Sequence, residues 1–335
     1  MAPILQAKNL VKKYGDNAAV NDISFQVEEG EVFGLLGPNG AGKTTTISML
    51  TGILKPTAGT AVIGGYDIRT QLAQAKKLNG LVPQELALYP TLSARANLSF
   101  FGGVYGLSGR ALKERVENVL RIVALTDRAD EPVETYSGGM KRRVNIAAGL
   151  VHQPRLLFLD EPTVGVDPQS RHHIFDSVLR LNRERGMSII YTTHYMEEVE
   201  MLCDRAAIID MGKIVAIGRV KEMIGMLGEG VIYLTLERAD EALCADLAGL
   251  PAVSGATLVP PPLAPPPAPD APDAEPAARP PAGQQVKIEI EESRTALAGI
   301  FNYMHTRNVQ VLSVEILEPN LESVFLHLTG KKLRE

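Results

Sequence analysis

The stretch GPNGAGKT, Gly37 to Thr44, decides how this sequence is interpreted. It fits the pattern G-x-x-x-x-G-K-[ST], it follows the apolar segment Glu31–Gly37, and it opens a segment, Lys43–Leu54, in which we expect a helix. A strand, a glycine-rich loop and a helix in this order form the context in which the pattern binds nucleotide phosphates. We therefore predict a phosphate-binding loop; the alternative is a glycine-rich turn with a chance lysine.

Each residue type in this loop suits contact with a nucleotide. The glycines let the backbone approach closely and point N–H groups at phosphate. Lys43 adds positive charge at the β and γ phosphates, where it also supports catalysis, and the Thr44 hydroxyl is placed to bind Mg²⁺. The Thr45 hydroxyl is available to a further phosphate oxygen. The residues expected to contact the nucleotide here are Gly37, Pro38, Asn39, Gly40, Ala41, Gly42, Lys43, Thr44 and Thr45.

A second apolar segment, LLFLDE at Leu156–Glu161, ends in two acids. A strand here brings Asp160 to its carboxyl end, which is where ligands bind in open α/β sheets. We expect Asp160 to hold Mg²⁺ through water and Glu161 to polarise the attacking water. Two acids at the end of a strand otherwise indicate a solvated loop, but the phosphate-binding loop favours the functional interpretation.

Further segments indicate the fold class. Residues 78–84 are expected to form a short strand, and the continuous apolar runs within 155–162 and 187–194 are typical of strands in a parallel sheet that is covered on both faces. A helical pattern at 168–184 lies between the last two, and this order of elements favours a parallel α/β core. Helical spacing dominates residues 92–151. We predict an α/β fold with a mostly parallel sheet, a helical subdomain inserted at about 90–152, and an ATP-binding domain at 1–228.

The sequence changes character near residue 229. Residues 231–237 are typical of a strand, and two further strands, in QVKIEI and VQVLSVEIL, flank a helix expected at 294–305. Between them, eleven of the 22 residues at 260–281 are proline, and the segment has few side chains that could pack, so we expect it to be extended or disordered. We predict a small α+β accessory domain at 229–330, interrupted by a proline-rich disordered insert at 260–281. The alternative is a linker that joins two unrelated pieces.

Composition limits the classes of partner. A net charge of −5 and a pI of about 5.8 argue against a broad basic surface for nucleic acid. Cys203 and Cys244 lie far apart without Cys/His spacing, so we expect free thiols and no metal centre there. The first residues lack the pattern of a signal peptide, and no run of about 18 apolar residues is present that could span a bilayer. Any role at a membrane is therefore expected to be peripheral.

A second glycine motif, YSGGMKRR at 136–143, opens the segment 140–151, in which we also expect a helix. Ser137 and the two glycines after it suit an anion at a helix N-terminus, because N–H groups there lack intrahelical partners. One chain thus carries two predicted phosphate sites and only one set of acids. We interpret Lys141, Arg142 and Arg143 as a solvated helix face, with a dimer seam as the alternative.

The motifs in their order resemble the nucleotide-binding subunit of ABC transporters. The resemblance covers residues 5–218 and rests on KKYG, GPNGAGKTT, VPQ, YSGGM, LLFLDEP, GVD and TTHYMEE. The C-terminal EPNLESVFLHLTGK resembles the accessory domain of ATPase subunits in the ABC-2 type exporter branch, including daunorubicin-resistance-like drug exporters. The resemblance implies a P-loop NTPase (RecA-like) core, ATP and Mg²⁺ as cofactors, and a peripheral position at the cytoplasmic face of the cell membrane.

The resemblance also assigns the second glycine motif. Ser137, Gly138 and Gly139 would face the γ-phosphate of ATP bound by a second copy of the chain, and Asp167 would organise that interface. ATP would join the two subunits, and its hydrolysis would loosen them. The resemblance further implies a multi-span permease of the ABC-2 type as partner and no nucleic acid.

Three more residues take roles from the resemblance. Tyr14 would stack on adenine, Gln84 would contact Mg²⁺ or the attacking water, and His194 would contact the γ-phosphate and orient Glu161. Tyr14 as a strand residue, Gln84 as a turn residue and a structural histidine are the alternatives. The chain departs from the common pattern at Tyr136 and Met140, whose side chains are not needed for backbone N–H donation.

Two other functions remain open from the sequence. One is a soluble ABC-type ATPase that acts on the ribosome or on nucleic acid. The other is a nucleotide-dependent interaction module without turnover. The intact Lys43, Asp160, Glu161 and His194 argue against a module without turnover, and the resemblance of the C-terminal segment favours export.

Overall fold

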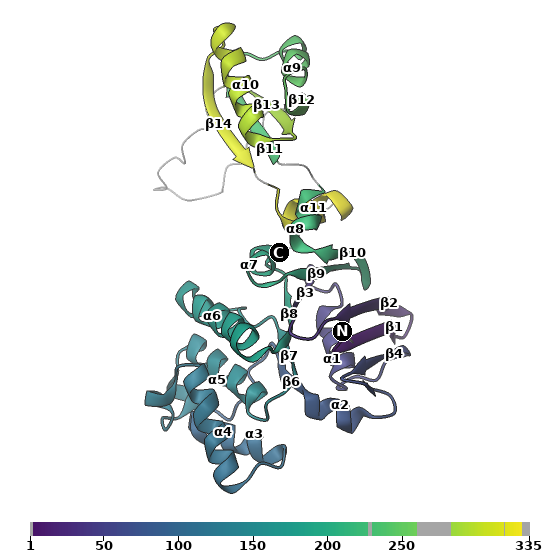
Figure 1. Cartoon of the computed structure of the whole chain (residues 1–335), viewed down its shortest axis with the longest axis vertical. Coiled ribbons are helices and arrows are strands. Elements are labelled where there is room, and N and C mark those ends of the chain that lie inside the picture. Colours follow the sequence, from purple (N-terminus) through teal and green to yellow (C-terminus); the bar gives the residue numbers. More distant parts are fainter. Residues whose placement is uncertain (1–2, 227–229, 260–282, 318, 330–335) are drawn as a thin grey trace, which may run out of the picture. The chain divides into compact units, whose positions relative to one another are not determined.

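A computed structural model describes residues 3–226, 230–259, 283–317 and 319–329 (Figure 1). The proline-rich segment expected to be disordered at 260–281 lies outside these residues. The chain divides into two compact units. One comprises Met1–Lys221 together with Phe325–Glu335, and the other comprises Glu222–Val324.

A six-stranded sheet forms the centre of the first unit, in the order β10-β9-β3-β8-β7-β6. Five strands run parallel, and β10 alone pairs antiparallel with β9. Every residue of β3, β7 and β8 is buried, as the continuous apolar runs predict for a sheet covered on both faces. The strands are β3 (Val32–Leu36), β6 (Asn79–Val82), β7 (Leu156–Asp160), β8 (Ser188–Thr193), β9 (Arg205–Asp210) and β10 (Lys213–Arg219).

A second sheet of four antiparallel strands, in the order β2-β1-β4-β5, was not expected from the sequence. Its apolar side chains, such as Leu5 and Ile23, belong to the same core as Phe33 and Ile190 of the central sheet. The two sheets therefore share one hydrophobic core. The strands are β1 (Leu5–Tyr14), β2 (Asn17–Val27), β4 (Ala58–Ile63) and β5 (Tyr66–Asp67).

Helices complete the first unit. Between β6 and β7 the chain forms α3 (Ala94–Val104), α4 (Gly109–Ile122) and α5 (Gly138–Leu150), which group together in Figure 1 as the inserted helical part. Two 3₁₀ turns, Thr126–Arg128 and Val133–Thr135, connect α4 to α5. The remaining helices are α1 (Lys43–Leu50), α2 (Leu72–Leu78), α6 (Pro168–Arg185) and α7 (Met196–Leu202). Helix α1 ends earlier than expected, because Gly52 takes a left-handed φ of 71° beyond it.

The second unit contains a four-stranded antiparallel sheet in the order β12-β13-β11-β14. With its two helices it follows the β-α-β-β-α-β order of ferredoxin-like folds. Val259 of β12 pairs with Gln285 of β13, so the strands on both sides of residues 260–282 are hydrogen-bonded neighbours. The elements are β11 (Gly230–Leu236), α9 (Glu241–Ala248), β12 (Val253–Val259), β13 (Gln284–Ile290), α10 (Ser293–Thr306) and β14 (Val311–Leu317); α8 (Val220–Gly225) and α11 (Leu321–Thr329) span the boundaries between units.

Candidate functional site

The phosphate-binding loop lies between β3 and α1, as its pattern predicts. Gly40 and Gly42 have φ values of 80° and 107°, a region that strongly favours glycine. A Cβ on Gly37 would lie 2.2 Å from the carbonyl oxygen of Ile209, and one on Gly42 would lie 2.6 Å from that of Ala19. The glycines are therefore required by the packing of the loop itself.

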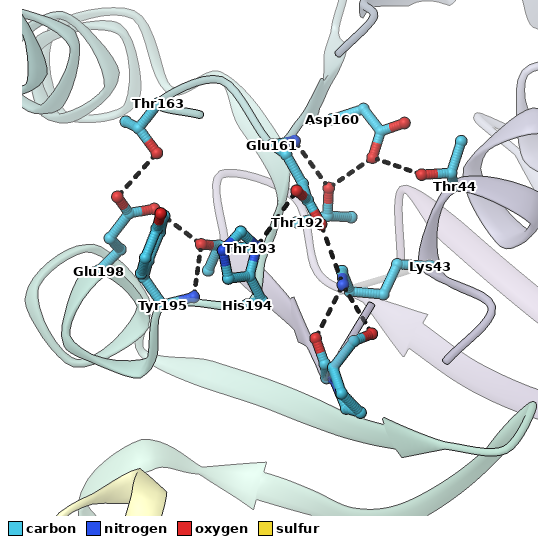
Figure 2. Close-up of polar contacts among 12 residues, drawn as sticks. Lys43, Thr44, Asp160, Glu161, Thr163, Thr192, Thr193, His194, Tyr195 and Glu198 are labelled. Carbon is cyan, nitrogen blue, oxygen red and sulfur yellow. Dashed lines mark hydrogen bonds and ion pairs between the residues drawn. The ribbon is translucent and has the colours of Figure 1, made fainter. Parts of the chain in front are cut away.

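Lys43 is buried inside this loop, with only 4% of its surface exposed. Its Nζ donates hydrogen bonds to the carbonyl oxygens of Gly37 at 2.7 Å and Pro38 at 3.1 Å. The same Nζ lies 3.0 Å from Oε1 of Glu161 (Figure 2). The ammonium group is thus held by the loop's own backbone and by the acid that follows β7.

Glu161 connects two of the predicted catalytic residues. Its Oε1 faces Lys43, and its Oε2 lies 3.2 Å from Nδ1 of His194. Its backbone has a φ of 45°, and its N–H donates to the hydroxyl and the carbonyl oxygen of Thr192. A non-glycine residue in this region stores strain, which in proteins clusters at functional sites. The structure therefore brings the side chains of Lys43, Glu161 and His194 together.

Asp160, the neighbouring acid, is also buried. Its Oδ1 accepts hydrogen bonds from the Thr192 hydroxyl at 2.7 Å and from the Thr44 hydroxyl at 3.3 Å. Burial raises the pKa of Asp160, and these two hydrogen bonds act in the opposite direction. The carboxylate is therefore held toward Thr44, beside the start of α1.

The oxygens of Thr44 and Asp160 fit a nucleotide-bound Mg²⁺. Mg²⁺ prefers oxygen ligands, and it commonly binds one or two protein groups together with substrate phosphates and water. No group of three or more His, Cys, Asp or Glu side chains suited to a metal occurs in the part of the chain that the structure describes. The hydroxyl of Thr44 and the carboxylate of Asp160 thus form a donor set that fits a metal that arrives with phosphate.

Tyr14 and Gln84 lie at exposed ends of strands. Tyr14 ends β1 with 52% of its surface exposed, and Nζ of Lys12 lies 5.2 Å from the centre of its ring. Gln84 follows β6 and is exposed. Among the described residues, the Gln84 side chain forms no hydrogen bond with Lys43 or Asp160, so the structure does not join it to the buried groups.

Helix α5 holds the segment that carries Gln84. Arg142 donates to the carbonyl oxygens of Pro83 at 3.1 Å and Gln84 at 2.8 Å. Asn145 donates to Pro83 at 3.2 Å and accepts from the N–H of Ala87 at 3.2 Å. Arg142 and Asn145 are 6% and 2% exposed, and burial lowers the pKa of Arg142.

The interpretation of 141–143 as a solvated helix face is therefore wrong for Arg142. A pattern of charges along one helix cannot show that another segment of the chain covers it. Here the segment after β6 packs on α5. The guanidinium group of Arg142 donates hydrogen bonds to backbone carbonyl oxygens of that segment, which need such partners when they are buried. Arg143 is half-buried and donates to the carbonyl oxygen of Val123 at 3.0 Å.

The second glycine motif begins α5, with Ser137 as the N-cap. Its Oγ accepts a hydrogen bond from the N–H of Met140 at 3.2 Å. Ser137 and Gly138 are exposed, and a Cβ on Gly138 would have no atom within 4 Å. Gly139 is buried, and a Cβ there would lie 2.0 Å from Oγ of Ser170. Tyr136 is buried, and its hydroxyl donates a hydrogen bond to the carbonyl oxygen of Arg128.

Asp167 lies beside this motif at the start of α6. It is the N-cap of that helix and accepts a hydrogen bond from the N–H of Ser170 at 2.9 Å, and this bond lowers its pKa. In Figure 1, α5 and α1 lie apart, separated by the central strands. Within the described ranges, no hydrogen bond joins Ser137 to the phosphate-binding loop of the same chain. Ser137, Gly139 and Asp167 thus form a second group of predicted residues, separate from the group around Lys43, while Tyr14 and Gln84 belong to neither.

The sequence interpretation did not identify a set of polar residues behind His194. Thr163, Thr193 and Glu198 are all buried, and the hydroxyls of both threonines donate hydrogen bonds to the Glu198 carboxylate (Figure 2). The signal available in the sequence is the pair of threonines before His194, since hydroxyls at the end of a buried strand need partners.

Several known proteins are similar to this chain in sequence. A family model described as ABC transporter matches residues 20–164. The chain is 45% identical over 335 residues to the linearmycin resistance ATP-binding protein LnrL of Bacillus subtilis (strain 168), covering 99% of this chain and 100% of that protein. It is 37% identical over 336 residues to the Nod factor export ATP-binding protein I of Ralstonia nicotianae, covering 99% of this chain and 96% of that protein.

A solved structure confirms the predicted fold class. An ATP-binding cassette, described as a dimer in a post-hydrolysis state bound to ADP and Pi, superposes with a TM-score of 0.59 at 25% identity, covering 64% of this chain and 98% of that one. The family resemblance noted in the motifs is confirmed as well, which decides against an interaction module without turnover. The chain belongs to the ABC transporter family, as an ATP-binding subunit that hydrolyses ATP to drive transport.

Proposed function

We propose that this protein drives export through a separate membrane permease of the ABC-2 type, as a dimer that closes around ATP. Similarity along almost the whole chain to a Nod factor export protein and to a linearmycin resistance protein supports export. No helix in the described ranges is long and apolar enough to cross a bilayer. The chain would act at the cytoplasmic face of the membrane, held there by its permease.

The residue roles follow from the first group of site residues. Lys43 and the loop N–H groups would bind the β and γ phosphates, Thr44 and Asp160 would hold Mg²⁺, and Gln84 would contact Mg²⁺ or the attacking water. The metal supplies charge neutralisation at the phosphates. Glu161 activates the attacking water and His194 orients Glu161, as their 3.2 Å contact supports. Tyr14 stacks on the adenine.

One observation supports an ATP site that is shared between two copies of the chain. Ser137 and Gly138 are exposed at the start of α5, and in Figure 1 this helix lies apart from α1, which follows the phosphate-binding loop. An N-capped helix terminus offers N–H donors and a positive dipole end that favour an anion. The γ-phosphate bound by a second copy is the anion that this motif would meet. Asp167, beside Gly139, then lies at the same interface.

The surface around Gln84 suits the permease. Tyr89 and Phe100 are each 46% exposed, and their rings meet edge to face with centres 5.0 Å apart. Leu86 is 43% exposed in the same segment. Exposed aromatic and apolar groups close together are typical of protein contact surfaces. The hydrogen bonds of Arg142 and Asn145 would couple a permease bound at this surface to helix α5.

The two domains would have different roles. We assign ATP binding to residues 1–228 and an accessory role to residues 229–330. The site residues all lie before residue 200, and the βαββαβ sheet has its own core, formed by residues such as Ile232, Leu234 and Ile288.

Replacement of Glu161 by glutamine tests the proposal. In the full chain with saturating Mg-ATP, we expect phosphate release to fall to background and an ATP-bound dimer to accumulate, measured by analytical ultracentrifugation. The exposed Glu197→Gln serves as the control, because it removes one charge nearby without touching the site. Wild-type turnover by Glu161→Gln, or a strictly monomeric state with permease and Mg-ATP present, would overturn the proposal.

A further inference from the structure

A buried carboxylate lies behind the proposed catalytic pair. Glu198, on α7, is 2% exposed. Its Oε1 accepts a hydrogen bond from the Thr163 hydroxyl at 2.7 Å, and its Oε2 accepts from the hydroxyls of Tyr191 and Thr193, both at 2.9 Å. Nε of Arg171 lies 3.8 Å from Oε1. Three hydroxyl donors and one cation thus surround a single side chain.

Burial of such a group is expensive unless it is fully paired. A carboxylate taken out of water loses several kcal/mol of solvation, and an apolar side chain of the same size commonly gives an equally stable core. Stability alone therefore gives no reason for an acid at position 198. Glu198 also has no contact with Lys43, Thr44 or Asp160 within the described residues, so it does not hold phosphate or metal.

The position of its partners in the chain suggests a role. Thr193 immediately precedes His194, and its hydroxyl also accepts a hydrogen bond from the N–H of Tyr195, on the other side of His194. Thr163 lies two residues after Glu161. One carboxylate therefore anchors the two segments that carry the proposed catalytic pair, as Figure 2 shows.

We propose that Glu198 is a positioning residue that fixes His194 against Glu161. The inference rests on the proposed roles of those two residues. The contact between His194 and Glu161 joins the ends of two separate strands, β8 and β7, and the hydrogen bonds of Glu198 hold the chain on both sides of that contact. A displacement of about 1 Å in a catalytic group can reduce a rate on the order of 10²-fold.

A double-mutant cycle on the full chain tests this role. The variants are Glu198→Gln, His194→Ala and the two together, with single-turnover hydrolysis and nucleotide affinity measured for each. We expect Glu198→Gln to lower the hydrolysis rate about 10- to 100-fold while ATP affinity changes little. Because Glu198 acts through His194, the double variant should be no slower than His194→Ala alone.

Two further variants separate positioning from simple loss of stability. Glu31 is also a buried glutamate, 9% exposed and paired with Arg205 at 3.0 Å, but it lies outside the contacts of Glu161 and His194. Glu31→Gln should leave the hydrolysis rate unchanged. Thr163→Val removes one hydrogen bond to Glu198 and keeps the charge of that carboxylate. It should lower the hydrolysis rate by a smaller factor than Glu198→Gln, and it provides the test if Glu198→Gln does not fold.

The outcomes distinguish this inference from the proposed function. Wild-type rates in Glu198→Gln and Thr163→Val, or a loss that adds in full to that of His194→Ala, would overturn the positioning role. Glu161→Gln, measured in parallel, reports on the catalytic pair itself. If Glu161→Gln hydrolyses ATP normally, the proposed function fails, and if only the variants at 198 and 163 behave as wild type, only the inference fails.

Discussion

Nζ of Lys43 lies 3.0 Å from Oε1 of Glu161, and both side chains are almost completely buried. The lysine proposed to bind phosphate and the proposed catalytic acid therefore form an ion pair in the folded chain. A phosphate that binds Lys43 must compete with Glu161 for the same ammonium group. Release of Glu161 from Lys43 would then accompany nucleotide binding and leave its carboxylate available to water.

Removal of Lys43 should destabilise the nucleotide-free protein as well as prevent ATP binding. Lys43→Met leaves the Glu161 carboxylate buried without its cation, and loss of one partner of a buried pair costs about 3–5 kcal/mol. The control is the double variant Lys43→Met/Glu161→Gln, which removes both charges and should recover part of that loss. Urea unfolding measures the difference. Equal stability of the single and double variants would show that the pair contributes nothing.

The two glycines of the second motif should respond differently to alanine. Gly138→Ala meets open space, so the free energy of unfolding should not change, while turnover should fall because the methyl group obstructs the partner's phosphate. Gly139→Ala places a Cβ against Ser170 within the same chain and should lose about 1–3 kcal/mol of stability.

Ser170→Gly is the matched control for this pair of variants. Combined with Gly139→Ala it removes both Ser170 side-chain atoms that the new Cβ would meet, so stability should return. Thermal unfolding and phosphate release on each variant measure the two effects separately. Full turnover by Gly138→Ala would contradict a shared site at this motif.

Asn145 should control the opening of the segment after β6. Its Oδ1 accepts from the N–H of Ala87, so Asn145→Ala removes the partner of that donor and should increase hydrogen exchange at Ala87. The lost hydrogen bonds should cost about 1–3 kcal/mol, since buried polar groups of Pro83 and Arg142 remain nearby. Lys141→Ala, on the same helix and only half-buried, is the control. Unchanged exchange at Ala87 in Asn145→Ala would contradict the contact.

Asp160→Asn should raise stability while it lowers turnover. Burial raises the pKa of Asp160, so this carboxyl group stays protonated to a higher pH in the folded state than in the unfolded state. The free energy of unfolding of the wild type therefore decreases as the pH rises above the pKa of Asp160 in the unfolded chain, about 3.9. Both hydroxyl hydrogen bonds go to Oδ1, which an asparagine oxygen can replace. The gain in melting temperature should be absent below about pH 3.9 and grow above it. A gain independent of pH would contradict this cause.

The sequence predicts the site best where short motifs act locally. The loop around Lys43 carries its own geometry in its glycines, and Asp160 and Glu161 follow directly from a buried strand. Parallel strands bring their carboxyl ends to one edge, which is why His194 meets Glu161 as expected. Family resemblance supplies the separate role of Ser137, which no local pattern could give.

The features that could not be predicted from the sequence depend on contacts between segments that are far apart in the chain. Strand β1 has irregular register against β2 and β4, with several bulges, so its apolar residues do not alternate cleanly. The burial of Arg142 results from a segment about 58 residues earlier in the chain. The carboxylate of Glu198 looks like an ordinary surface acid in TTHYMEE, and only the fold shows the hydroxyls that surround it.

The pairing of Val259 with Gln285 has a practical consequence. The chain leaves the sheet at the end of β12 and returns to it at the start of β13, the neighbouring strand. The two ends of the connection between these strands therefore lie close together. The entropy of closing such a connection grows only slowly with its length. Residues 260–282 are therefore a natural point at which to shorten the protein, or to fuse a fluorescent reporter, while both strands keep their partners.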